Sequence, residues 1–272
     1  MVIEANRAPK PTGTGWRTLA ALFGLLVVGS LLPVGMLVGI PLLILIGLRG
    51  ISNKGLFIAT VLAMFVVLSG QRDPLWYIER GWAVLLGGSF AAVTVVFPQW
   101  RLTSKSLASV GAALLGTTIF CVFASGAWSS IEWGVNDRLA AVLGNFLYAL
   151  ALVSEGQAVS PVFIAAVNRT VELQAEVFPA VLALESMAAL GVAWWLYQRI
   201  GFGDDQALGS VRYFGFNDHL VWVLIIGLLL VFAQLGESPT RVGANFAVFM
   251  TVLYALRGVG VVVFVNEGLT FL

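Results

Sequence analysis

Three polar side chains, Glu185, Gln234 and Asn245, lie in or at the ends of apolar stretches and could take part in chemistry. A carboxyl group or an amide is costly to place at membrane depth, so such residues are candidates for function. At helical rise, Glu185 lies about 10 Å inside its stretch, counted from the side where Gln234 and Asn245 also lie. We expect the three to line a polar pocket for a small molecule.

Each of these residues also has a structural interpretation. Glu185 could be a neutral acid hydrogen-bonded to a neighbouring helix, and Asn245 could make an interhelical hydrogen bond. Tyr254 and Arg257 are two further candidate polar or anchoring residues inside the last stretch. Arg257 lies about 22 Å from the same side, where it could act as an anchor at the opposite membrane face. A direct pair between Glu185 and Arg257 is therefore not expected.

The sequence predicts no catalytic residue, no metal site and no cofactor. It has one cysteine, Cys121, and one histidine, His219, so a single chain cannot build a cysteine–histidine zinc site. No phosphate-binding loop, dinucleotide fingerprint or hydrolase elbow is present. Only Glu185 is an acid well inside an apolar stretch, and no second acid or nucleophile is placed to work with it. The expectation is that the chain is not an enzyme.

Small residues recur at four-residue spacing in the last apolar stretch: Gly243, Ala247, Thr251 and Ala255. In a helix this spacing gives a smooth stripe that lets another helix approach closely. The stripe predicts helix packing, either within the chain or against a partner.

The composition indicates a helical membrane protein. Hydrophobic residues make up 59% of the 272 residues and charged residues 11%, whereas soluble domains carry about 25% charged residues. Repeated apolar runs approach the roughly 20 residues needed to cross a bilayer. The net charge of +1 gives no sign of nucleic-acid binding. No cleavable signal peptide is recognised before the first run.

We predict an all-α polytopic bundle that forms one integral membrane domain over 1–272, with about eight spans. The predicted spans are 18–32, 35–48, 55–69, 81–97, 106–127, 178–198, 220–235 and 242–265. Pro33 is the reason for dividing 18–48 into two helices, and a single kinked helix is the alternative. Asp218 is expected to cap the start of the seventh span.

A helical hairpin over 131–177 is expected before the sixth span, outside the membrane or at its interface. Residues 139–153 are apolar but short for a span, whereas Val162–Val177 has an apolar face and an opposite charged face. The alternative is that 139–153 crosses the membrane, which would invert everything after it. With eight spans, the excess of lysine and arginine predicts that both termini are cytoplasmic and the hairpin is outside.

Several stretches together resemble the YybS-like family of bacterial integral membrane proteins of unknown function. They are Pro41 to Gly50, Gly55, Pro179, Trp195 to Arg199, Phe216 to Trp222, Gly243 to Asn245 and Tyr254 to Gly258. The family is similar in span layout to the substrate-binding S-components of energy-coupling-factor transporters, a likeness at the level of fold. The resemblance implies a multi-pass protein of the bacterial inner membrane.

Two functions follow as expectations. The first is a small-molecule binding or transport component in the lipid bilayer, which would need an energising partner because no nucleotide site is present. The alternative is a non-catalytic membrane scaffold that docks other proteins through the small-residue stripe and the hairpin. An intramembrane enzyme ranks third.

Overall fold

The computed structural model describes residues 20, 22, 24, 33–48, 58, 61, 75–153, 160–200 and 215–269, and these ranges are helical apart from short connections. Within them no strand is present, as the sequence predicts. The elements are α2 (Val34–Leu48), α4 (Leu75–Val96), α5 (Leu102–Phe123), α6 (Ala127–Val153), α7 (Pro161–Glu176), α8 (Phe178–Arg199), the 3₁₀ turn η2 (Asp218–Leu220), α9 (Val221–Phe232) and α10 (Glu237–Leu269).

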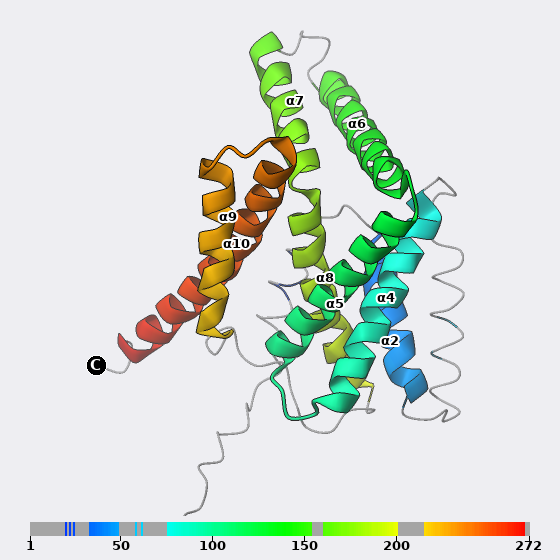
Figure 1. Cartoon of the computed structure of the whole chain (residues 1–272), viewed down its shortest axis with the longest axis vertical. Helices are drawn as coiled ribbons and strands as arrows, with labels where there is room; N and C mark the ends of the chain where they lie inside the picture. Colours follow the sequence, from blue (N-terminus) through cyan, green and yellow to red (C-terminus); the bar gives the residue numbers. More distant parts are fainter. Residues whose placement is uncertain are drawn as a thin grey trace, which may run out of the picture.

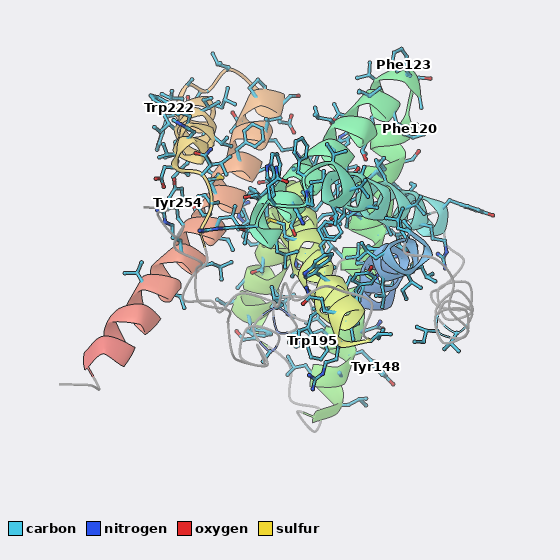
Figure 2. The ribbon with its side chains drawn as sticks, turned by 90° about the horizontal axis from the view of Figure 1, so that it is seen from below. Phe120, Phe123, Tyr148, Trp195, Trp222 and Tyr254 are labelled. Atoms are coloured by element: carbon cyan, nitrogen blue, oxygen red, sulfur yellow. The ribbon has the colours of Figure 1, made fainter. Side chains whose placement is uncertain are left out.

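Three of these helices are long and apolar enough to cross a membrane: Leu102–Phe123, Phe178–Arg199 and Glu237–Val262. Two shorter apolar helices, Val34–Leu48 and Asp218–Phe232, accompany them. Large apolar side chains lie on the outside of the bundle, among them Phe123 and Trp222 (Figure 2). Such a surface suits lipid and not water.

Several helices differ in their bounds from the predicted spans, because charged residues lie inside helices. The span expected at 81–97 belongs to α4, which starts at Leu75 and therefore includes Glu79 and Arg80. The span expected at 106–127 is α5, Leu102–Phe123, which includes Lys105. The span expected at 242–265 belongs to α10, which starts at Glu237, where an acidic residue suits the positive end of a helix.

Other predicted elements lie close to their expected places. The short second helix expected at 35–48 is α2, which begins after Pro33, and the sixth span at 178–198 is α8. The seventh span, expected at 220–235, lies slightly earlier in the chain, because η2 and α9 together run from Asp218 to Phe232. The predicted spans 18–32 and 55–69 lie outside the described residues, except for 20, 22, 24, 58 and 61.

Helix α8 runs through the middle of the bundle, with α2, α4, α5 and α10 packed around it (Figure 1). Half of its buried residues are small, including Ala183, Ser186 and Ala189, so neighbouring helices can come close. The Trp82 indole donates to the Ser186 hydroxyl at 3.0 Å, and both side chains are buried. Phe90 of α4 packs edge-on against Trp194, with ring centroids 5.9 Å apart.

The hairpin of α6 and α7 projects beyond one end of the bundle, which we call the hairpin end (Figure 1). It begins at Ala127, earlier than the expected 131, and α6 is one continuous helix through the apolar run 139–153. The opposite end holds the connection from α4 to α5 and the start of α9, and we call it the Trp100 end. The two ends have different polar clusters.

Candidate functional site

Asn245, one of the three predicted pocket residues, lies at the junction between α7 and α8. Its Oδ1 accepts a hydrogen bond from the backbone N–H of Ala180 at 2.9 Å. Its Nδ2 donates to the carbonyl of Glu176 at 3.0 Å and to that of Arg241 at 2.9 Å. One side chain of α10 therefore pairs backbone groups at the end of α7 and at the start of α8.

Arg241 reinforces the same junction one helical turn earlier on α10. Its guanidinium donates to the carbonyls of Ala175 and Glu176 at 3.3 and 3.4 Å, and to a carboxylate oxygen of Glu132 at 2.5 Å. The guanidinium also lies over the ring of Trp128, 5.7 Å from its centroid.

This arrangement explains how α7 and α8 can be separated by a single non-helical residue, Val177. Helix ends leave backbone N–H and C=O groups without partners, and no side chain of its own caps the start of α8. Pro179 in the first turn of α8 also favours a helix start there. The Ala180 N–H bonds the Val177 carbonyl at 3.0 Å, and Asn245 and Arg241 add side-chain partners from α10. We call these two residues with Glu132 and Trp128 the junction cluster.

The other two predicted pocket residues lie elsewhere. Gln234 is exposed in the turn between α9 and α10, with a φ of 49°. Glu185 is 1% exposed on α8, five residues beyond Ala180, which corresponds to about 7.5 Å of helical rise. The hydrogen bonds of Asn245 go to backbone groups at the junction. The convergence of the three residues on one pocket stays a prediction.

Arg257 and Tyr254 belong to a second cluster, at the Trp100 end. Arg257 donates to Asp218 Oδ1 at 2.7 Å, and its guanidinium lies 5.6 Å from the ring centroid of Phe216. Phe216 packs edge-on against Tyr254 at 5.1 Å. The expected cap by Asp218 is not formed, because Asn217 accepts from the His219 N–H instead. Asp218 is thereby available to link η2 to α10.

The small-residue stripe is divided between two environments. At Gly243 an added Cβ would lie 2.6 Å from the carbonyl oxygen of Gly227, and at Gly227 it would lie 3.0 Å from the Ala247 nitrogen. The first half of the stripe therefore packs backbone to backbone against α9. Thr251 and Ala255, in the second half, are exposed.

Two buried charged groups were missed from the sequence. Lys105, just before the span predicted at 106–127, is 2% exposed. Its Nζ donates to the Pro98 carbonyl at 3.0 Å and lies 5.5 Å from the Trp194 ring centroid. Glu79, 4% exposed, forms an ion pair with Arg138 that ties α4 to α6. The only sign of such buried charges in the sequence was the presence of opposite charges on neighbouring helices, which does not show which residues pair.

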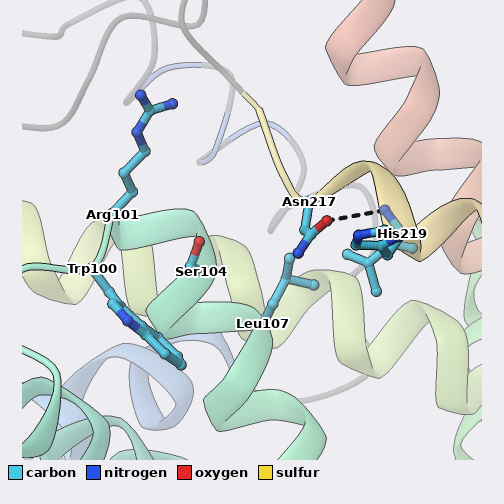
Figure 3. A pocket seen from close by; sticks show the side chains of 7 residues that line it. Trp100, Arg101, Ser104, Leu107, Asn217 and His219 are labelled. Carbon is cyan, nitrogen blue, oxygen red and sulfur yellow. Dashed lines mark hydrogen bonds between the residues drawn. The ribbon is translucent and has the colours of Figure 1, made fainter.

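A pocket of about 450 Å³ opens at the Trp100 end (Figure 3). It is lined by Trp100, Arg101, Ser104, Leu107, Asn217, His219 and Leu220. Thr103 Oγ1 donates to the Gly215 carbonyl at 3.1 Å and so joins the two walls, which are far apart in sequence. None of the predicted pocket residues lines it.

By their length and composition the three candidate spans, together with the apolar exterior, suggest that this chain is a multi-pass helical membrane protein. No protein-family model, curated protein or solved structure matches it.

Proposed function

We propose that this chain is a non-catalytic assembly component of a bacterial cytoplasmic membrane, which docks a partner protein through the α6–α7 hairpin. The proposal rests on the uneven distribution of apolar and charged residues along the hairpin. Its far part exposes large apolar side chains: Val142 60%, Phe146 48%, Tyr148 68%, Leu152 66% and Val162 78%. Its base holds charged residues, including Arg138 and Glu132. Large apolar side chains exposed outside a bundle are a feature of interaction surfaces.

The base of the hairpin is fixed to the bundle, as a presenting arm requires. The Arg138–Glu79 ion pair joins α6 to α4, and the Arg241–Glu132 ion pair joins α6 to α10. Trp128 stacks on Phe178 with ring centroids 5.6 Å apart, which adds a contact with α8. A rigid base limits the entropy that binding would otherwise cost.

The proposal is tested with a photo-crosslinking amino acid at Phe146, with the same residue at Phe120 as the matched control. Both positions are exposed aromatics, one on the hairpin and one on α5. In living cells we expect a discrete protein adduct from position 146 and only lipid adducts from position 120. Lipid adducts alone at both positions would contradict a docking hairpin.

The topology belongs to the same proposal: about eight spans, both termini cytoplasmic and the hairpin outside. The resemblance to the YybS-like family and the distribution of basic residues support it. With Cys121 replaced by serine, a cysteine at Trp133 should react with a membrane-impermeant maleimide in intact cells. Protection at position 133 until the cells are lysed would overturn this orientation.

A small-molecule binding or transport component, similar in layout to the S-components, is the second candidate. It is favoured by Glu185, an acid that is 1% exposed in the central helix. Such a component would need an energising partner. Ligand-induced thermal stabilisation that is present in the wild type and lost in Glu185→Ala would support this function, and an unchanged shift would count against it.

A further inference from the structure

We propose that the pocket at the Trp100 end binds the phosphate group of an anionic phospholipid. The proposal concerns a different end of the molecule from the hairpin and does not depend on it. A volume of about 450 Å³ is within the range of small-molecule sites, about 300–1,000 Å³. It is large enough for a headgroup with the first part of its acyl chains.

The donors of the pocket come from two walls that face each other (Figure 3). Arg101 and Ser104 stand on the α5 side, and Asn217 and His219 on the other. Asn217 Oδ1 accepts the backbone N–H of His219 at 3.0 Å, which turns the amide nitrogen toward the pocket. Phosphate oxygens accept hydrogen bonds from amide and hydroxyl groups, which Asn217 and Ser104 supply here. The Arg101 guanidinium extends away from these two side chains, at the edge of the pocket (Figure 3).

The charge around the pocket favours an anion. None of the seven lining residues is acidic, and the nearby Asp218 carboxylate bonds to Arg257 at 2.7 Å. Among the described residues, no hydrogen bond or ion pair engages the Arg101 guanidinium, whereas its carbonyl accepts from the Lys105 N–H at 3.0 Å. No side chain caps α5, whose N-terminus begins at this wall, so its unpaired N–H groups add to the positive potential.

The apolar part of the lining favours a lipid over a free anion. Trp100 stacks on Phe97 with ring centroids 4.2 Å apart, and Leu107 and Leu220 complete an apolar wall. Tryptophan and arginine at a bundle end mark the headgroup level of a bilayer. Basic pockets between helices at the cytoplasmic face are suited to anionic headgroups, and the sequence predicts that this end faces the cytoplasm.

The test uses the full chain in detergent, titrated with phosphatidylglycerol or phosphatidylcholine and read by native mass spectrometry. We expect preferential retention of phosphatidylglycerol, weakened about tenfold by Arg101→Gln, in line with loss of a charge-assisted hydrogen bond. The matched control is Arg199→Gln, which removes the same charge from an exposed residue outside the pocket lining and should leave binding unchanged. Ser104→Phe, which fills the pocket, should weaken binding as Arg101→Gln does.

Three results would overturn the inference. Both lipids carry a phosphate, but only phosphatidylglycerol has a net negative charge, so equal retention of the two would show that the pocket does not select an anionic phospholipid. Equal weakening by Arg101→Gln and Arg199→Gln would assign the effect to surface charge in general. Displacement of phosphatidylglycerol by millimolar inorganic phosphate, sensitive to Arg101→Gln, would assign the pocket to a soluble phosphate compound.

Discussion

Helices α8 and α10 have nearly the same mean hydropathy but opposite environments. In the apolar 18-residue stretch of α8, 72% is buried inside the protein. In the corresponding stretch of α10, 17% is buried. The difference lies in side-chain size and not in apolarity, because α8 has small residues on all sides and α10 has them along one stripe. Since lipid is as apolar as leucine, close packing decides which helix becomes the centre of the bundle.

The largest effect is expected from removing a side chain that packs on α8. Phe90 is fully buried and contacts Trp194, so Phe90→Ala should destabilise the protein by roughly 3 kcal/mol through the cavity it leaves. Phe120→Ala, at a position 61% exposed on α5, should change stability by less than about 0.5 kcal/mol. Reversible unfolding in mixed micelles would compare them, and equal losses would refute a core centred on α8.

A second comparison separates the two halves of α10. Gly243→Ala places a methyl group against the Gly227 carbonyl and should cost about 1–3 kcal/mol. At Gly258 the same substitution meets no atom within 4 Å, and alanine should stabilise that helix by about 0.5–1 kcal/mol. Thermal unfolding of the two variants should therefore shift in opposite directions. A shift of the same sign in both would show that α9 and α10 do not pack through these glycines.

The junction cluster should give a smaller and more local effect. Asn245→Ala removes one hydrogen-bond partner from the Ala180 N–H and one from the Glu176 carbonyl. The first still donates to the Val177 carbonyl and the second still accepts from Arg241, so the cost should be about 0.5–1.5 kcal/mol. Hydrogen exchange at Ala180 should accelerate. Gln234→Asn, in the exposed turn, is the control and should leave that exchange unchanged. Unaltered protection of Ala180 in Asn245→Ala would show that Asn245 does not hold the junction.

The smallest effect is expected at the ion pair of the junction cluster. The side chains of Arg241 and Glu132 are 25% and 35% exposed, so solvent screens their attraction and Glu132→Gln should cost about 0.5–1 kcal/mol. Exposed Glu172→Gln on α7 should cost less than this. The two variants can be compared by chemical denaturation. A loss of several kcal/mol at Glu132 would mean that the hairpin base is far less hydrated than its exposure indicates.

The sequence predicted a helix well where the signal lay within that helix alone and did not depend on contacts with other helices. The length of the apolar run predicted the bounds of α8 closely. The apolar face opposite a charged face predicted a helix at α7. Charged residues misled the choice of helix ends, because Glu79 and Lys105 are buried with partners on other segments. A charged residue in the sequence suggests the boundary between membrane and water, but a partner on another segment can stabilise that charge inside the bundle.

The candidate sites were less predictable for the same reason. Asn245 stands out in the sequence as a polar residue in an apolar run, but its partners are backbone groups, including those of Glu176 and Ala180, which have no signature in the sequence. The pocket at the Trp100 end combines residues 100–107 with residues 217–220. Only the folded arrangement brings those segments together.

A photoactivatable phospholipid in reconstituted liposomes would test whether α8 is the enclosed axis of a membrane-embedded bundle. Adducts mapped by mass spectrometry should fall on the exposed residues of α5 and α10, such as Leu115, Phe120 and Val259. The stretch of α8 from Ala183 to Ala193 should remain unlabelled. Labelling of that stretch as strong as that of α5, or no labelling of α5 and α10, would contradict this arrangement.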